Sequence, residues 1–137
     1  MKKYFVDAPV ILKTALMESD SVSKRFGKIL KEVKLGKVEL LSQKLLTLEV
    51  ANGFRFGTSE VSEALKYFNV FLKLPIKYFS PTETQQRKVI EVSYDLGTTV
   101  YDTSYHILAK AHNAIFLTCD EDYYKKAKDL GDINFLG

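Results

Sequence analysis

The chain has 137 residues, a formal net charge of +3 and 46% hydrophobic residues, a composition that is typical of a globular domain and excludes a disordered chain. No apolar run approaches the roughly 18 residues of a membrane span, so no membrane association is expected. The only cysteine, Cys119, excludes an internal disulfide and favours a reducing, cytoplasmic location.

The first half of the chain alternates short apolar runs with helical patterns. Apolar runs predict buried strands at residues 2–7 and 37–42. Hydrophobic periodicity predicts helices at residues 8–16, with Pro9 in the first turn, at 19–36, ended by Gly36, at 43–57 and at 58–74. A Thr58-Ser59 pair followed by Glu60 resembles a capping pattern and predicts the start of the last of these helices.

The second half continues the same alternation. Strands are predicted at residues 76–80 and 114–118, with a fifth, edge strand at 132–137. Helices are predicted at residues 80–97, 100–113 and 120–131. Ser80 is the expected N-cap of the first of these helices, Pro81 its first residue and Gly97 its end.

This order of elements predicts an α/β fold with one domain over residues 1–137. We expect a three-layer sandwich around a central, mostly parallel sheet of four or five strands, because the strands are almost wholly apolar and must be covered on both faces. In such folds the ligand binds beyond the carboxyl ends of the strands, where the strand order reverses.

Acidic residues follow the predicted strands at that end of the sheet. Asp7 ends the first strand, Asp120 follows the fourth, and Asp102 opens a helix. If the first and fourth strands are neighbours, Asp7 and Asp120 face one crevice. Each of the three also has an ordinary explanation as a helix N-cap.

Glu49 has no such explanation, because it lies in the middle of a predicted helix. Its neighbours on the same helix face are apolar or small: Leu45, Leu46, Asn52 and Gly53. This pattern favours a carboxylate directed towards a polar site, with an edge position on the helix as the alternative.

Four carboxylates at one place repel one another unless a cation neutralises them. Mg²⁺ and Mn²⁺ prefer oxygen ligands, so they are the expected cofactors. No His or Cys cluster offers a site for a softer metal. His106 comes one helical turn after Asp102 and could lie near the acids, with a role in helix packing as the alternative.

Four segments, taken in order, resemble a PIN domain, and specifically the small VapC-type toxin ribonucleases. They are "YFVDAPVIL" with Asp7, "LLTLEVANGF" with Glu49, "VYDTSYHILA" with Asp102 and Tyr105, and "FLTCDEDYY" with Thr118 and Asp120. The third is similar to the family's most recognisable motif. One departure is Pro9, which stands where the family often has Ser or Thr.

The resemblance implies a metal-dependent endoribonuclease, a hydrolase that cuts RNA and acts as the toxin of a toxin–antitoxin pair. It implies catalytic and metal-binding roles for four acids: Asp7, Glu49, Asp102 and Asp120. Thr118 and Asp122 would be auxiliary residues near the site. RNA, a second copy of the chain and an antitoxin are the implied partners, and the candidates for binding the RNA backbone are Lys13, Lys44 and Arg55.

Three alternatives remain from the sequence. A PIN-fold module without catalysis could bind RNA or protein, and a PIN nuclease could serve RNA maturation instead of toxicity. A phosphoacceptor receiver domain is disfavoured, because the strands ending "FVDAP" and "IKYFS" lack the adjacent acids and the third-strand Asp that it needs.

Overall fold

A computed structural model describes residues 1–137, and a five-stranded parallel sheet lies at its centre. The strands are β1 (Lys2–Val6), β2 (Val38–Gln43), β3 (Ile76–Phe79), β4 (Ile115–Thr118) and β5 (Ile133–Phe135). Their order in the sheet is β3-β2-β1-β4-β5, so the order reverses between β1 and β4. The predicted edge strand at the end of the chain is confirmed as β5.

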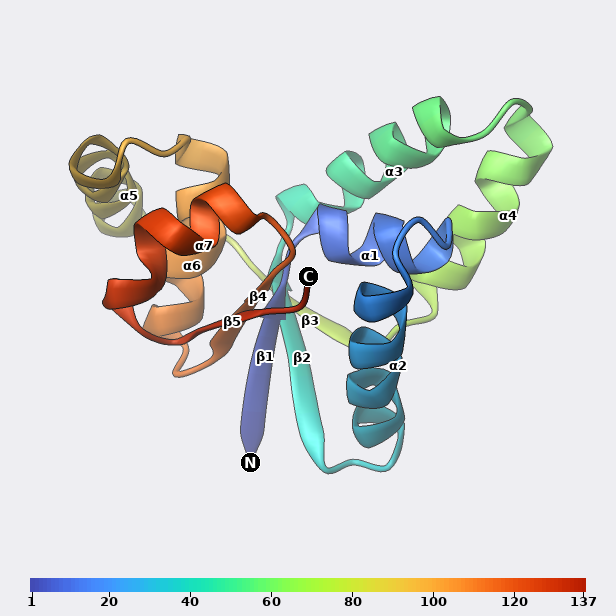
Figure 1. Ribbon diagram of the computed structural model, residues 1–137, viewed down its shortest axis with the longest axis horizontal. Coiled ribbons are helices and arrows are strands. Elements are labelled where there is room, and N and C mark those ends of the chain that lie inside the picture. Colours follow the sequence, from blue (N-terminus) through green and yellow to red (C-terminus); the bar gives the residue numbers. More distant parts are fainter.

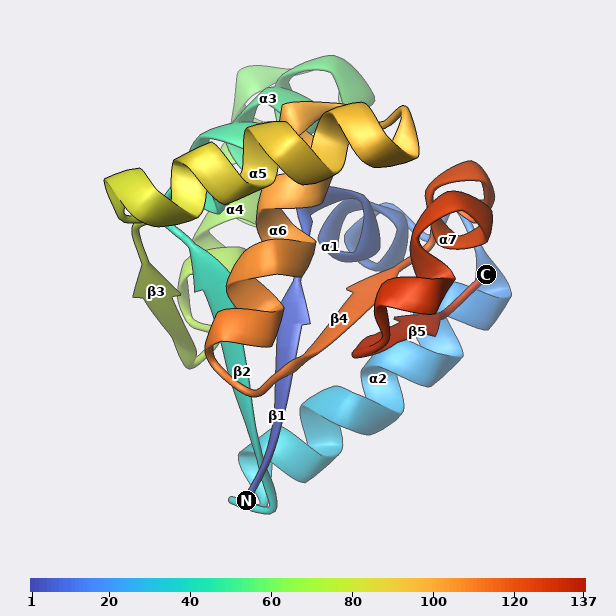
Figure 2. The same ribbon diagram turned by 90° about the vertical axis from the view of Figure 1, so that its left-hand side faces the viewer.

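Seven α-helices and one 3₁₀ turn cover the two faces of this sheet (Figure 1). The helices are α1 (Ala8–Ala15), α2 (Asp20–Lys34), α3 (Leu45–Gly57), α4 (Val61–Leu72), α5 (Glu83–Leu96), α6 (Val100–Ala111) and α7 (Glu121–Ala127), and the turn is Lys128–Leu130. Figures 1 and 2 show α5, α6 and α7 on one face and α1 to α4 on the other. The predicted three-layer sandwich is confirmed.

The core lies where the central strands meet the helices of both faces. Phe5 and Val6 of β1, Leu117 of β4, Leu46 of α3 and Leu108 of α6 are all fully buried. Residues from both strands and helices are therefore packed into one apolar cluster, which holds the ends of β1 and β4 in place. None of the helices combines the length and the apolar character that crossing a bilayer needs.

Three predicted helix starts are wrong: Gln43 belongs to β2 and not to α3, and both α4 and α5 begin later than expected. Helix α5 is capped by Thr82, which exchanges hydrogen bonds with Gln85 in a complete capping box, so it begins after Ser80 and Pro81. Thr58 does not cap α4, because its hydroxyl donates to the Phe54 carbonyl at 2.7 Å and so closes the preceding helix. Ser80 and Thr82 were both candidates for the cap of α5, and spacing alone does not choose between them, whereas α4 has Glu60 at its N-cap and no side-chain cap hydrogen bond.

Candidate active site

Asp7 and Asp120 follow the carboxyl ends of neighbouring strands. β1 pairs with β4 so that Val6 is opposite Leu117, and each acid follows its strand closely. Asp7 caps α1 by accepting a hydrogen bond from Val10 N at 3.3 Å, and Asp120 caps α7 by accepting from Tyr123 N at 3.0 Å. The predicted pairing of their two strands is therefore confirmed, and so is the ordinary capping role of both acids.

Asp102 is in the first turn of α6, but it is not the cap. Thr99 holds that position, and its side-chain oxygen accepts a hydrogen bond from Asp102 N at 3.1 Å. The capping explanation for Asp102 is wrong, because Thr99 already occupies the position three residues earlier. The carboxylate of Asp102 is therefore not committed to capping this helix.

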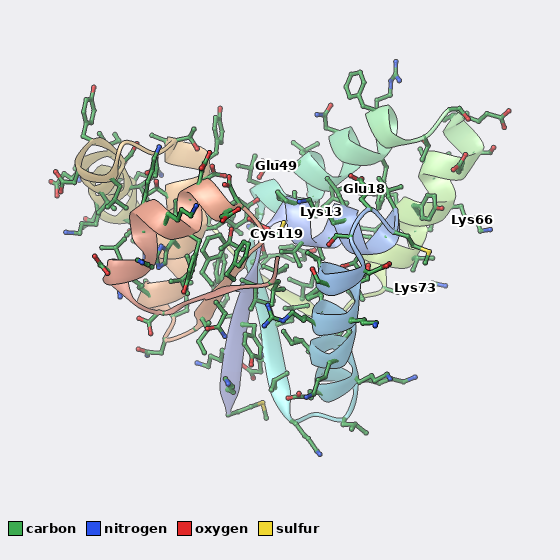
Figure 3. All side chains as sticks on the ribbon, in the orientation of Figure 1. Lys13, Glu18, Glu49, Lys66, Lys73 and Cys119 are labelled. Atoms are coloured by element: carbon green, nitrogen blue, oxygen red, sulfur yellow. The ribbon has the colours of Figure 1, made fainter.

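Glu49 lies in α3, on the side of the helix that faces α6 and α7 (Figure 3). Its side chain is half-buried, and one carboxylate oxygen accepts a short hydrogen bond from the Tyr105 hydroxyl of α6. The prediction that this mid-helix acid turns away from the open surface is confirmed in direction, since its partner is a buried residue of another helix.

Neighbouring negative charges raise the pKa of two of the four acids, Asp7 and Asp102. Burial raises the pKa of Asp7 to about 8, against the opposing hydrogen bond from Val10, and the negative charges of Asp102, Glu49 and Asp120 raise it further. The pKa of Asp102 is also raised, first by burial and then by the charge of Asp120, while a hydrogen bond with Thr99 lowers it.

No basic side chain of the protein neutralises this charge. The ion pairs of the chain are Lys77–Glu39, Arg87–Glu83, Lys110–Asp132 and Lys125–Glu121, and none includes an acid of the site. A set of carboxylate oxygens without a basic partner is the kind of donor set that suits a hard divalent cation.

The acids are nevertheless spread more widely than the sequence predicts. No three His, Cys, Asp or Glu side chains are placed so that they could share one metal ion. The hydrogen bonds explain this spacing, because Asp7 and Asp120 are turned towards their helix ends and Glu49 towards Tyr105. Mutual repulsion also favours separation of like charges.

Two polar recesses meet at the start of α7, and Asp120 and Asp122 line both of them. One, of 460 Å³, also contains Lys13, and the other, of 300 Å³, also contains Asp102 and Lys126. A larger hollow of 630 Å³ between α3 and α4 is mainly apolar and contains none of the site acids, so we place the chemistry at the recesses.

Of the three basic residues predicted to bind an RNA backbone, only Lys13 lies beside the acids. Arg55 is far along α3, where its guanidinium lies over the Phe56 ring at 4.9 Å and lines the apolar hollow. Lys44 is exposed at the start of α3. Lys126 lines the second recess and was not predicted, because on a short surface helix its sequence neighbourhood resembles any solvated face.

Buried hydroxyl and amide groups form hydrogen bonds between the elements that carry the acids, and most of these groups were not predicted. Ser42 donates to the Val6 carbonyl at 2.6 Å, and Gln43 Nε2 donates to Ser104 Oγ at 2.6 Å, which ties β2 to α6. Thr118 accepts from Asp120 N at 3.1 Å and shapes the turn that presents Asp120. The sequence did contain a signal for these groups, because two polar residues, Ser42 and Gln43, end the mainly apolar strand β2.

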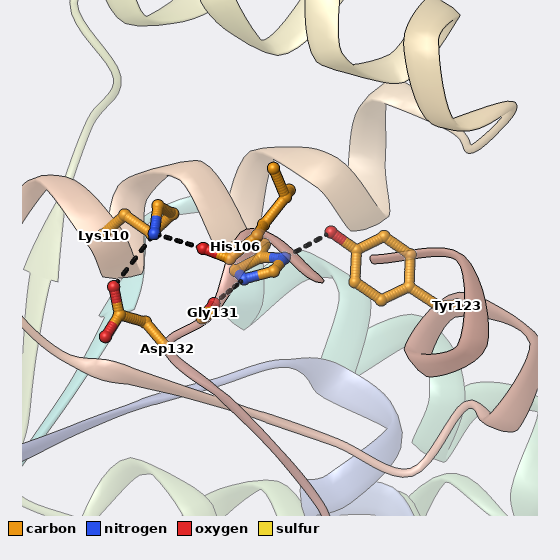
Figure 4. Close-up of polar contacts among 6 residues, drawn as sticks. His106, Lys110, Tyr123, Gly131 and Asp132 are labelled. Carbon is orange, nitrogen blue, oxygen red and sulfur yellow. Dashed lines mark hydrogen bonds and ion pairs between the residues drawn. The ribbon is translucent and has the colours of Figure 1, made fainter. Parts of the chain in front are cut away.

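His106 lines neither recess and reaches the second one only through its partner Tyr123, which is one of the residues that line it (Figure 4). It is fully buried; Nδ1 lies 2.9 Å from the Tyr123 hydroxyl and Nε2 lies 2.7 Å from the Gly131 carbonyl. Because a carbonyl only accepts, Nε2 carries the proton and Nδ1 accepts from Tyr123. The helix-packing alternative for His106 is therefore confirmed.

Cys119 precedes Asp120 in the chain, and its side chain is buried. Figure 3 labels Cys119 close to Lys13. Burial, followed by the charge of Asp7, raises the pKa of the Cys119 thiol to about 11. The thiol stays protonated at neutral pH, so the residue acts as a small packed side chain rather than a nucleophile.

Comparison with known proteins supports the fold. By sequence, no family model and no curated protein matches the chain. By structure, it is similar to VapBC2 from Rickettsia felis bound to a DNA fragment from their promoter, with a TM-score of 0.71, 12% identity and coverage of 98% of this chain and 99% of that one. It is also similar to PAE2754 from Pyrobaculum aerophilum, with a TM-score of 0.66, 23% identity and coverage of 93% and 87%.

The chain shares the fold of these two structures, a three-layer α/β fold of the PIN-like kind. In this fold the strand order reverses between β1 and β4, which are the strands that Asp7 and Asp120 follow.

Proposed function

We propose that this protein is a divalent-metal-dependent endoribonuclease that hydrolyses phosphodiester bonds of RNA, and that it acts as the toxin of a toxin–antitoxin pair in the cytoplasm. The observation that carries the proposal is the uncompensated charge of the site. Burial and neighbouring carboxylates raise the pKa of Asp7 to about 8 and also raise the pKa of Asp102, and no basic side chain forms an ion pair with any of the four acids. The PIN fold adds support as a likeness to VapC-type nucleases.

Asp7, Glu49, Asp102 and Asp120 are the residues that would hold Mg²⁺ or Mn²⁺. When bound, such an ion supplies a Lewis acid that lowers the pKa of a water and neutralises charge on a phosphate. The buried carboxyl of Asp7 would lose its proton on binding, since a cation favours the charged form. Small movements of Glu49 and Asp102 would bring their oxygens together, because the cation removes the repulsion that separates them.

The surrounding residues would hold the substrate. Lys13 lies beside Asp120 in the larger polar recess and offers an ammonium group to a phosphate that approaches the acids. Lys126 does the same from the opposite recess, where its ammonium also donates to the Gly97 carbonyl at 3.2 Å. Thr118 and Asp122 are auxiliary: Thr118 fixes the turn of Asp120, and Asp122 adds negative charge at the mouth of both recesses.

The likeness to a VapBC structure also supports an antitoxin partner, and we propose a homodimer as well. Several apolar side chains are open to solvent, among them Tyr94, which is 86% exposed, and Tyr101, which is 64% exposed. The aromatic-rich segment at residues 67–79 could supply part of such an interface, because Val70 and Leu72 are exposed, although Phe71 is buried. Light scattering of the purified chain tests the dimer, and co-purification with the product of the adjacent reading frame tests the antitoxin.

An RNA-cleavage assay tests the nuclease. The purified protein should cut members of a panel of transfer and ribosomal RNAs with Mg²⁺ or Mn²⁺ and stop when EDTA is added. Asp7→Ala and Asp102→Ala should lose cleavage and keep RNA binding, while the exposed control Asp95→Ala should behave like the unaltered protein.

The spread of the acids gives one rival some support: a PIN-fold module that binds RNA or protein without catalysis. Binding without cleavage under every divalent metal would establish that module and reject the nuclease. Cleavage confined to immature ribosomal or transfer RNA would instead favour a role in RNA maturation.

A further inference from the structure

A third recess, the Tyr101 recess, lies across the first turn of α6 from the polar recess that contains Asp102. It has a volume of 230 Å³, and its walls are mainly apolar, formed by Leu45 of α3, Ile90 of α5 and Val100 and Tyr101 of α6. Tyr101 and Asp102 are consecutive residues, yet they line different recesses. The first turn of α6 therefore separates an apolar recess from the acids.

The floor of the Tyr101 recess is polar. Gln43 and Ser104 line it and are 4% and 9% exposed. Ser104 Oγ donates its one hydrogen to the Tyr101 carbonyl at 2.6 Å, so it must accept from Gln43, and the amide nitrogen Nε2 faces it at 2.6 Å. Gln43 Oε1 is thus left without a hydrogen-bond partner in the protein. It is not enclosed, because the Ser23 hydroxyl is the only enclosed side-chain atom that lacks a partner. A buried amide therefore presents a free acceptor to the recess.

Gln43 is also the neighbour of Asp7 across the sheet. β1 and β2 are parallel, with Phe5 opposite Leu41, so Asp7 after β1 is level with Gln43 at the end of β2. Neighbouring strands are about 4.8 Å apart. The floor of the Tyr101 recess therefore begins one strand away from Asp7, on the side opposite to Asp120.

The size and chemistry of the recess suit one flat, polar-edged ring. The recess is smaller than the pockets of about 300–1,000 Å³ that enclose drug-sized ligands, so it can take a ring system but not a whole nucleotide. Tyr101 is 64% exposed, and its ring is free to stack with such a ligand. Stacking on an aromatic ring and hydrogen bonding along the base edge are the contacts by which proteins hold unpaired bases of RNA.

We propose that the Tyr101 recess binds one unpaired base of the RNA, which stacks on Tyr101 and donates an N–H group to Gln43 Oε1. This inference rests on the proposed ribonuclease function and names its substrate class as single-stranded RNA. A strand that crosses the first turn of α6 would place a base in the recess and a neighbouring phosphate beside the acids, where Lys126 offers positive charge. Tyr101 and Gln43 bind the base and take no part in hydrolysis, so their effect is measurable in the absence of metal.

The direct test is the affinity for a fluorescently labelled single-stranded oligoadenylate, measured by anisotropy in EDTA. Tyr101→Ala should weaken binding by about 5- to 150-fold, the loss that removal of one base–aromatic stack gives. Tyr101→Phe keeps the ring and should bind as the unaltered protein does. The matched control Tyr94→Ala removes another exposed tyrosine, from α5 and outside the recess, and should leave the affinity unchanged. The same RNA paired with its complement should bind more weakly and should not respond to Tyr101→Ala.

A second test addresses the base edge. Adenine carries an N6–H donor that purine lacks, so replacing adenosine by purine riboside should weaken binding by about 2- to 12-fold, the worth of one hydrogen bond. Gln43→Met removes the acceptor at similar side-chain length and should abolish this difference between the two RNAs. If Gln43→Met does not fold, the comparison on the unaltered protein decides the question, since equal affinity for both RNAs would reject the contact.

The outcomes distinguish this inference from the proposed function. Unchanged affinity of Tyr101→Ala, a loss that Tyr101→Phe shares, or equal binding of the duplex overturns the base recess and leaves the nuclease standing. Conversion of a dimer to a monomer by Tyr101→Ala, seen by light scattering, would assign the recess to an interface between two copies and also reject the proposal. Failure of the unaltered protein to bind single-stranded RNA overturns the inference, and it overturns the proposed function only if RNA cleavage is absent as well.

Discussion

Helix α6 contributes to two polar clusters that differ in charge and in burial. At its first turns, Asp102 and Tyr105 face the acids of the site, where negative charges accumulate without a basic partner. One residue further on, His106 joins Tyr123 and Gly131 in a neutral cluster in which both ring nitrogens have a hydrogen-bond partner. A satisfied neutral cluster stabilises the fold, whereas an uncompensated charged one is retained at a cost in stability and indicates a ligand.

The largest expected effect is on RNA cleavage, which should depend on the acidic cluster and not on the neutral one. Asp102→Asn should lower RNA cleavage by at least about 10³-fold, because it removes a metal-binding carboxylate. The same change should keep or raise the melting temperature in EDTA, since it relieves repulsion and Thr99 still caps the helix. Cleavage rates and thermal melts of one preparation check both statements, and a large loss of melting temperature would show that Asp102 is mainly structural.

The opposite result is expected in the neutral cluster. His106→Leu should destabilise the fold by about 2–4 kcal/mol, because the Tyr123 hydroxyl and the Gly131 carbonyl lose their buried partner. Cleavage per folded molecule should be retained at a temperature where the variant is folded. Urea unfolding with parallel cleavage assays tests this prediction. Loss of activity in a fully folded variant would show that His106 contributes to cleavage.

The two clusters should also respond to pH in opposite directions. The Asp7 pKa is raised to about 8 in the folded protein, so the stability linked to its proton is complete below about pH 4 and is lost as the pH rises through 8. The pKa of His106 is lowered, chiefly by burial, so its contribution is lost as the pH falls below about 6.5.

Melting temperatures in EDTA between pH 5 and 9 measure this contrast. Asp7→Asn should flatten the decline on the alkaline side, because Asn keeps the helix cap without the charge. Mg²⁺ should raise the melting temperature of the unaltered protein at pH 8 and leave that of Asp7→Asn nearly unchanged. An identical alkaline decline in the variant would assign the effect to other groups.

The smallest effect compares two helix caps. Thr99→Ala and Thr82→Ala should each destabilise by about 1 kcal/mol, since each removes a side-chain cap. Only Thr99→Ala should also reduce cleavage, because Thr99 interacts with Asp102, whereas Thr82 caps α5 away from the acids. Equal activity of the two variants would show that the Thr99 contact does not orient Asp102.

Local patterns in the sequence were enough for the architecture. The alternation of apolar runs and helical periodicity predicted every strand and helix, and the apolar strands predicted a parallel sheet covered on both faces. The positions of Asp7 and Asp120 after their strands predicted that they would meet, because parallel strands end at one edge of the sheet. Glu49 was recognisable because an acid in mid-helix beside apolar neighbours has no local explanation.

Tertiary structure decided which hydrogen bonds these side chains make. Sequence spacing leaves three features undecided, because each depends on geometry. They are the choice of Thr82 over Ser80 as the cap of α5, the choice of Thr99 over Asp102 as the cap of α6, and the hydrogen bonding of His106 away from the acids. The pairing of Tyr105 with Glu49 joins residues 56 positions apart. Sequence periodicity reports what is near along one helix, whereas the spread of the acids follows from contacts between elements that only the folded sheet brings together.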